Sequence, residues 1–509
     1  MALLLLATSL PACTEDRPAG GDAATAPADT TYNPICDTGG DSLCAAIPHI
    51  VKVNLKPGYS GVNPRDQRHF DVFSWQSFVA LNWPADDGGK PLASFAGNPS
   101  APRVWETYED ASTVYGGVSS PCALPAGTRL LGQMAKNGDV VDPGGDYDEA
   151  VGGPLVDRNL NYVLYEKKVN PEEVAYLRAN RLNTAAGQYA ADSAGQRLQF
   201  PAGDTAGANG GPVGAIEIKA SWRILQPEKG DDTTRYFTRR GVVYVAARNS
   251  STGRPLCLNA TVGLVGMHIA HKTNQFFGAW IWSTFEHVDN APTCTDSVAG
   301  ARCGASQPKW SFYNGACTTC VRNDSLHLAG TGDTTFLWAP KPPYAIRYAI
   351  GGQFGNQITR TQPIYPETDS VNAEWMPRVK GTVWTHYRLI GSQWMSGDGG
   401  SDLVPAPKIL RNTTLESYLP QTSSCLGCHQ FAYTLGLPAA SGPMAGDSVF
   451  ADFSFLLRMA RRGSDDSGLP RFSAQTARRV PVTRHPTLEM APVPGLAARQ
   501  PAATPAKMP

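Results

Sequence analysis

The chain has 509 residues, of which 44 are Lys or Arg and 44 are Asp or Glu, so its formal net charge is zero. With only 17% charged residues it lacks the basic excess typical of nucleic-acid-binding proteins, and 42% hydrophobic residues exclude disorder of the whole chain. The 51 glycines and 41 prolines favour many turns over long helical bundles.

The first twelve residues are largely apolar and are followed by Cys13. Because this run is shorter than the ~20 residues that a membrane-spanning helix needs, we assign residues 1–12 to a signal peptide. Residues 10–13 resemble a bacterial lipobox, so we predict a lipid on Cys13 that anchors an exported protein to a membrane, in the periplasm or at the cell surface. Residues 13–60 are predicted to form a flexible linker. Plain secretion without a lipid is the alternative.

Two helices are predicted in the first half of the chain. Residues 70–81 place large apolar side chains at helical spacing, which predicts a short buried helix. Asn170 is a favourable capping residue, Pro171 needs no amide hydrogen at the first helical position, and two glutamates follow at the positive end of the helix dipole. This second helix is predicted to end near Arg181.

The centre of the chain is rich in predicted strands. Apolar and polar residues alternate over 216–224, which is typical of a strand with one buried face. Residues 261–271 and 278–288 are rich in β-branched and aromatic residues and are joined by a polar segment, which predicts an antiparallel pair. We therefore predict a β-rich α+β fold, with a large antiparallel-sheet body over residues 61–395.

Cysteine usage points to an oxidising compartment. Setting aside Cys13, Cys425 and Cys428 leaves eight of the 11 cysteines, enough for four disulfides. We expect local pairing, such as Cys36 with Cys44. The alternative for the last four of these eight cysteines is a zinc site; they are Cys294, Cys303, Cys317 and Cys320.

Two histidine-containing groups are candidate sites. Trp384, His386 and Arg388 are alternate residues, so a strand would present them on one face, where His386 and Arg388 are candidate catalytic residues that bind and polarise a peroxide. The alternative is a packed strand with a hydrogen-bonded histidine. The second group lies on the predicted strand pair, as a shared metal site or as separate hydrogen-bonded side chains; its members are His268, His271, Glu286 and His287.

Residues 425–429 read Cys-Leu-Gly-Cys-His, the attachment signature of c-type haem. In this signature two thiols form thioethers with the haem vinyl groups, and the adjacent imidazole ligates the iron. We therefore predict one covalent haem c, attached at Cys425 and Cys428 with His429 as an iron ligand. The sixth ligand is not determined by the sequence; Met444 and Met459 are the nearby candidates, with a role as core residues as the alternative.

The region around the motif is too short for a separate cytochrome domain. Residues 396–463 are predicted to be a mostly helical and loop haem c segment packed on the body, so that the body supplies part of the haem pocket. Within it, residues 452–462 have an apolar face at helical spacing. Residues 464–509 are rich in Pro, Ala and Arg and are predicted to be a disordered tail.

In three segments the chain resembles a group of large exported bacterial proteins described as "cytochrome c family protein". The segments are WSTFEHVDN at 282–290, CLGCH at 425–429 and DFSFLL at 452–457, and the resemblance covers about residues 65 to 462. It implies a single covalent haem near the C-terminus of a large β-containing body. The same resemblance implies attachment at Cys425 and Cys428 and axial ligation by His429, and it implies no particular reaction.

Three functions follow from these features. The first is electron transfer by a lipid-anchored monohaem protein with a periplasmic or cell-surface redox partner. The second is a haem-dependent redox enzyme, a peroxidase or oxygenase, with an open iron position. The third is an aromatic-rich binding module in which the haem is structural or sensory.

Overall fold

The structure is a computed structural model that describes residues 43–51, 67–116, 122–125, 127–131, 154–204, 212–274, 280–294, 303, 310–317, 320–324, 337–345, 355–396, 404–419, 421–435 and 450–460. The chain divides into one unit over Met1–Gly463 and another over Ser464–Pro509. All described residues belong to the first unit. The predicted signal peptide, Cys13, Cys36 and the predicted C-terminal tail lie outside the described residues.

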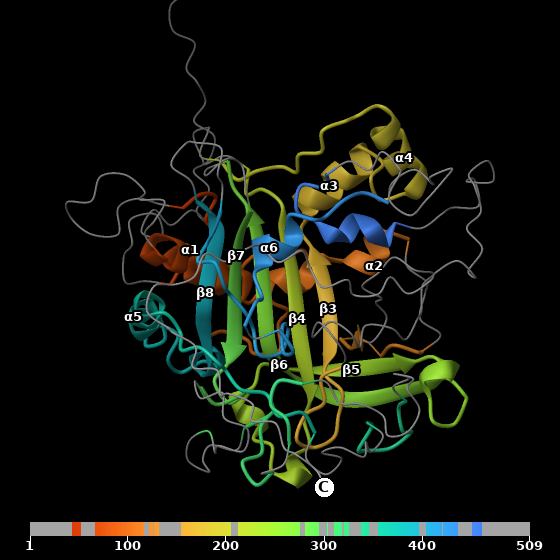
Figure 1. Cartoon of the computed structure of the whole chain (residues 1–509), viewed down its shortest axis with the longest axis vertical. Helices are drawn as coiled ribbons and strands as arrows, with labels where there is room; N and C mark the ends of the chain where they lie inside the picture. Colours follow the sequence, from red (N-terminus) through yellow and green to blue (C-terminus); the bar gives the residue numbers. More distant parts are fainter. Residues whose placement is uncertain are drawn as a thin grey trace, which may run out of the picture. The chain divides into compact units, whose positions relative to one another are not determined.

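The first unit contains a nine-stranded sheet with helices on its two faces (Figure 1). The strands are β1 (Glu109–Asp110), β2 (Arg129–Leu131), β3 (Leu164–Val169), β4 (Ile216–Ile224), β5 (Thr238–Val245), β6 (Leu256–Lys272), β7 (Trp280–His287), β8 (Tyr387–Ser396) and β9 (Val404–Ala406). The α-helices are α1 (Gln67–Leu81), α2 (Ala111–Val114), α3 (Pro171–Ala179), α4 (Ala185–Ser193), α5 (Pro366–Trp375) and α6 (Cys425–His429). Short 3₁₀ turns include η2 (Val104–Thr107), η4 (Pro227–Lys229), η5 (Thr233–Arg235), η6 (Ala247–Asn249), η8 (Val383–His386) and η9 (Phe455–Met459).

The sheet order is β1-β3-β4-β6-β7-β8-β9, with β5 paired to β6 and β2 paired to β5. Every pairing is antiparallel except that of β2 with β5. The predicted β-rich α+β class and the predicted antiparallel pair are therefore confirmed. β6 begins earlier than predicted, because its first half pairs with β5 and its second half pairs with β4 and β7.

The two predicted helices are also confirmed. α1 begins three residues before the predicted start and ends at the predicted residue. α3 begins at Pro171 as predicted, since the Asn170 side chain accepts a hydrogen bond from the Glu173 amide, and it ends at Ala179, two residues early. Strand β4 has the predicted bounds.

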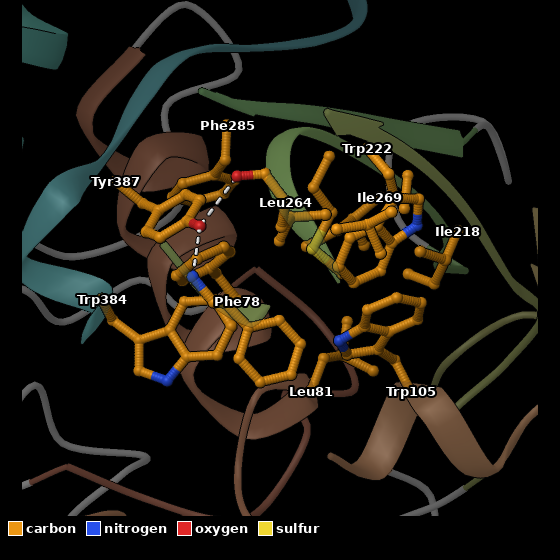
Figure 2. Close-up of a cluster of buried hydrophobic side chains, with 14 of the residues drawn as sticks. Phe78, Leu81, Trp105, Ile218, Trp222, Leu264, Ile269, Phe285, Trp384 and Tyr387 are labelled. Atoms are coloured by element: carbon orange, nitrogen blue, oxygen red, sulfur yellow. Dashed lines mark hydrogen bonds between the residues drawn. The ribbon is translucent and has the colours of Figure 1, made fainter. Parts of the chain in front are cut away.

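The main apolar core lies between the sheet and α1. Alternate residues of β4, such as Ile218 and Trp222, are at most 1% exposed and face this core, and Phe285 of β7 joins them. Figure 2 shows Phe78 of α1 against Phe285, with Trp384 and Tyr387 beside them. The Tyr387 hydroxyl donates to the Leu264 carbonyl at 2.8 Å, so the one polar atom of that ring is satisfied inside the core.

α1 is buried on nearly all sides, because α5 covers its outer surface. Its buried polar residues therefore form hydrogen bonds inside the protein: Ser74 Oγ lies 2.6 Å from the hydroxyls of both Ser283 and Ser392. Burial raises the pKa of Asp71 to about 6, although hydrogen bonds from Thr368 and Ser392 oppose the rise. These bonds fix α1 against β7 and β8.

Three disulfides are formed among the described residues: Cys122–Cys257, Cys294–Cys303 and Cys317–Cys320. Cys44 is disulfide-bonded as well, and its predicted partner Cys36 lies outside the described residues. Two of the three pairs are local, as expected, whereas Cys122–Cys257 joins residues 135 apart in the sequence. The zinc alternative is wrong, because disulfides leave its four cysteines without thiolates to offer a metal.

Two features depart from the sequence-based boundaries. Residues 43–51 fall within the predicted linker, yet Val51 is fully buried against Phe70 and Phe73 of α1, so the packed body includes residues before 61. The predicted helix over 452–462 is wrong. Asp452 and Phe453 have φ of 47° and 70°, which an α-helix does not accommodate, and only the short turn η9 follows them.

Candidate functional site

The Cys-Leu-Gly-Cys-His motif forms the short helix α6. Ser424 caps it, with its hydroxyl accepting from the Gly427 amide at 3.0 Å. Cys425, Cys428 and His429 occupy positions i, i+3 and i+4, so a helical turn brings both sulfurs and the imidazole to one side. Cys428 is exposed and the other two are half-buried. Both cysteines are thiols, and burial raises the pKa of the Cys425 thiol well above its usual value.

The sheet holds α6 through one buried glutamine. Gln393 of β8 is fully buried, its side-chain oxygen accepts from the Leu426 amide at 2.8 Å, and its Nε2 donates to the Pro407 carbonyl at 2.6 Å. Ser392 and Trp394, the neighbours of Gln393, point to the α1 side. Because side chains alternate along a strand, α6 lies on the opposite face of the sheet from α1 (Figure 1).

The His429 ring is fixed by a backbone carbonyl. Its Nδ1 lies 2.7 Å from the carbonyl oxygen of Phe453. A carbonyl only accepts hydrogen bonds, so Nδ1 carries the proton and the lone pair of the neutral imidazole is on Nε2. The rings of Trp282 and Phe455 lie with centroids 5.1 and 5.0 Å from the imidazole centroid. An aromatic wall therefore flanks this histidine.

Residues 450–460, which we call the strap, are themselves bound to the sheet. Asp452 forms an ion pair with Lys272 of β6 and accepts from the Phe200 amide at 2.8 Å, and its carbonyl accepts from Trp280 Nε1 at 2.7 Å. These contacts hold the strap in its left-handed conformation and aim the carbonyl of Phe453 at His429. Sequence reasoning missed this arrangement.

A pair of buried carboxyl groups lies behind the strap. Glu173 of α3 and Glu217 of β4 act on each other's pKa, and Ser454 of the strap is hydrogen-bonded to Glu217. Neither carboxyl oxygen of Glu173 has a hydrogen-bond partner in the described part of the chain. Burial is the main cause that raises the pKa of Glu217 to about 7 and that of Glu173 well above its usual value. Tyr115 and Lys272 face the same pair.

This pair predicts a stability that falls as pH rises. Each folded-state pKa lies above the unfolded value of 4.5, so between about pH 4.5 and 7 the folded state keeps a proton that the unfolded state has lost. We expect this contribution to the free energy of unfolding to decline by ~3 kcal/mol across that window. Urea denaturation at several pH values should show a flatter profile for Glu173→Gln/Glu217→Gln, and an exposed control, Glu367→Gln, should follow the wild type. A double variant with an unchanged profile would contradict the assignment.

The structure places the remaining predicted residues as follows. Met459 is half-buried in the apolar cluster that also contains Cys425 and Trp282, and its role as a sixth ligand stays a prediction. Met395 of β8 packs in the same cluster, although the sequence did not single it out. Met444 lies outside the described residues.

The predicted strand face for Trp384, His386 and Arg388 is wrong. The Thr382 side chain caps a 3₁₀ turn over Val383–His386, so β8 begins only at Tyr387 and the alternation fails. Trp384 is buried in the main core and the His386 ring lies 6.1 Å from that of His287. Tyr387 and Gln393 are six residues apart on β8, which at about 3.3 Å per residue separates His386 from α6 by roughly 20 Å.

The second histidine group does not form a shared site. His271 Nε2 lies 2.8 Å from the Val213 carbonyl, His287 Nε2 lies 2.9 Å from the Arg235 carbonyl, and His268 Nε2 lies 3.4 Å from Glu416 Oε2. Within the described part of the chain, no three His, Cys, Asp or Glu side chains gather in a way that could hold a metal ion. Each histidine therefore has its own partner, a backbone carbonyl for His271 and His287 and the Glu416 carboxylate for His268.

No protein-family model, curated protein or solved structure matches the chain. No helix among the described residues is both long enough and apolar enough to cross a membrane.

Proposed function

We propose that the protein carries one covalent haem c on Cys425 and Cys428 and acts in electron transfer. The observation that carries this proposal is the hydrogen bond from His429 Nδ1 to the Phe453 carbonyl. Metal-ligating histidines commonly donate their second ring N–H to a carbonyl or carboxylate, which fixes the tautomer and the ring orientation. The Phe453 carbonyl holds His429 in this way.

The residues around the motif fit such a group. The two thiols and the imidazole project from one side of a capped helical turn, and Cys428 is exposed. Apolar rings of Trp282, Phe453 and Phe455 surround the histidine, as a porphyrin requires. Haem would supply one-electron chemistry. The chain would orient the axial imidazole, position the two sulfurs through Gln393 and α6, and keep water from the strap side.

Export is part of the proposal. Disulfides persist in oxidising compartments and are rare in the cytosol, and the three formed here support a periplasmic or cell-surface location. A lipid on Cys13 would then anchor the protein beside its redox partner. We keep electron transfer ahead of enzymatic turnover because His386, the candidate catalytic histidine, lies far along β8 from the motif.

An absorption spectrum of the full chain, co-expressed with haem-attachment machinery, tests the proposal. Spectra are recorded oxidised, reduced with dithionite, and reduced under carbon monoxide. We expect covalent haem that cycles between the two redox states and that carbon monoxide leaves unchanged, because a filled sixth position suits electron transfer. Prompt carbon monoxide binding would favour the enzyme alternative.

The attachment itself is checked on a denaturing gel stained for haem. Cys425→Ser/Cys428→Ser should lose the stain, whereas Cys317→Ser/Cys320→Ser, which removes a disulfide elsewhere, should keep it. A stained band in the first variant, or no stain in the wild type, would overturn the proposed cofactor.

A further inference from the structure

Three arginines converge on one carboxylate on the α6 side of the sheet. The carboxylate is Glu286 of β7, four residues after Trp282 and therefore on the same face of that strand. Arg360 Nη2 lies 2.5 Å from Glu286 Oε2, and Arg388 of β8 is the strand partner of Glu286. Arg411, from the loop between β9 and α6, interacts electrostatically with both Arg360 and Glu286.

The carboxylate of Glu286 already has several bonded partners within the protein. Besides Arg360, it accepts the Thr413 amide at 2.6 Å and the Thr413 hydroxyl at 2.8 Å. Glu286 is fully buried and is the carboxylate that all three arginines share. Asp369 and Asp289 also act on Arg388, and Asp289 is itself paired with Arg235.

Arg411 is the arginine of this group whose two terminal nitrogens have no hydrogen-bond partner in the described part of the chain. The Nε atoms of Arg360 and Arg388 also have none there. The side chain of Arg411 is buried, with the residue 8% exposed. Burial and then the charge of Arg360 lower the pKa of Arg411 to about 10, so it remains cationic at neutral pH. A buried unpaired guanidinium is costly, and an anion would remove that cost.

The arginines are held in place by their backbones. The Leu410 amide donates to the Ser423 carbonyl at 3.0 Å, and Asn412 Nδ2 donates to the Phe285 carbonyl at 2.9 Å, so both neighbours of Arg411 are fixed. The amide of Arg360 donates to the Pro292 carbonyl at 2.8 Å. The group lies near the surface, because Arg388 is half-buried and Tyr365, which interacts electrostatically with Arg411, is 37% exposed.

We propose that Arg360, Arg388 and Arg411 form a binding site for an oxyanion, a carboxylate or phosphate group. Guanidinium groups bind such anions through paired charge-assisted hydrogen bonds. Two sources offer this chemistry. One is a free oxyanion. The other, which rests on the proposed function, is the carboxylates of a haem attached at Cys425, because Leu410, next to Arg411, packs in one apolar cluster with Cys425.

Calorimetric titration with inorganic phosphate at constant ionic strength tests the site. The full chain is prepared with haem and, without attachment machinery, haem-free. We expect the haem-free protein to bind phosphate and Arg411→Met to weaken that affinity about tenfold or more, the loss expected for a charge-assisted pair. Arg178→Gln, which removes an exposed arginine paired with Glu109, is the control and should bind like the wild type.

The haem-loaded form separates the two sources. If it no longer binds phosphate, haem carboxylates occupy the site; if it binds equally well, the ligand is a free oxyanion. Phosphate binding that neither Arg411→Met nor Arg388→Met weakens, with both variants folded by circular dichroism, would overturn the proposal, as would no binding to the haem-free chain. Failure to attach haem would overturn the proposed function. The phosphate titration of the haem-free protein would then still decide whether the three arginines bind an oxyanion.

Discussion

His429→Ala is expected to abolish the low-spin spectrum of the haem-loaded protein while its fold is kept. The imidazole is the nitrogen base that α6 would offer an iron, and with Nδ1 bonded to the Phe453 carbonyl the proposed ligating atom is Nε2. His429 is half-buried against Trp282 and Phe455, so its replacement by alanine opens only a small gap at the edge of the apolar cluster and should leave the fold intact. Absorption spectra before and after reduction, with far-UV circular dichroism as the folding check, measure the effect.

His386→Ala is the matched control for that experiment. His386 is also partly buried and also lies beside β8, but at the end of the strand remote from α6. We expect its spectrum to equal that of the wild type. A low-spin spectrum that survives in His429→Ala, or that is lost in His386→Ala, would refute the assignment of the axial ligand.

Arg223→Met is expected to cost about 3–5 kcal/mol of stability, the typical loss when one partner of a buried ion pair is removed. Arg223 of β4 donates from Nε to Asp157 and from Nη2 to Asp231, each at 2.7 Å. Its side chain is 2% exposed and that of Asp157 is fully buried, so methionine fills the volume but leaves a carboxylate without its cation. Urea denaturation at neutral pH measures the change.

An exposed pair provides the comparison for this loss. Arg178 and Glu109 also form a bonded ion pair, but their side chains are 51% and 38% exposed. Solvent screens such pairs, so Arg178→Met should cost no more than about 1 kcal/mol. Equal losses in the two variants would contradict the view that burial sets the cost.

Sequence features within a few residues of each other correctly predicted one helix and one strand. The helix at Pro171 follows from a capping side chain and a proline within three residues, and the strand at Ile216 follows from alternation along one segment. The motif at α6 was likewise readable, because its five residues are consecutive. In each case the physical cause lies within one turn or one strand.

The predictions that were wrong involve competing interactions from elsewhere. Alternation over 383–389 suggested a strand, but the Thr382 hydroxyl offers the backbone a capped turn instead. Helical spacing over 452–462 was overridden when Lys272 and Phe200 bound the Asp452 side chain and fixed a left-handed backbone. Periodicity alone carries no information about such long-range partners.

The same limit applies to the candidate site. Cys425, Cys428 and His429 were predicted from spacing, whereas nothing in the sequence connects Gln393 with Leu426, or Phe453 with His429. The three arginines are equally scattered, at positions 360, 388 and 411, and only strand register and loop packing bring them together. Spacing thus proposes Cys425, Cys428 and His429, and it carries no sign of the residues that position them.

If the proposed haem is attached, the layout of its motif fixes an order of events during biogenesis. The five motif residues are contiguous and are therefore complete in a chain that has not yet folded. The residues that position the motif are Trp282, Gln393 and those of the strap, and they come together only after β7 and β8 have paired. Thioether formation can thus precede folding, and a chain that folds first would present Cys425 half-buried to the attachment enzymes. On this proposal the unfolded chain, rather than the finished protein, is the better substrate for haem attachment.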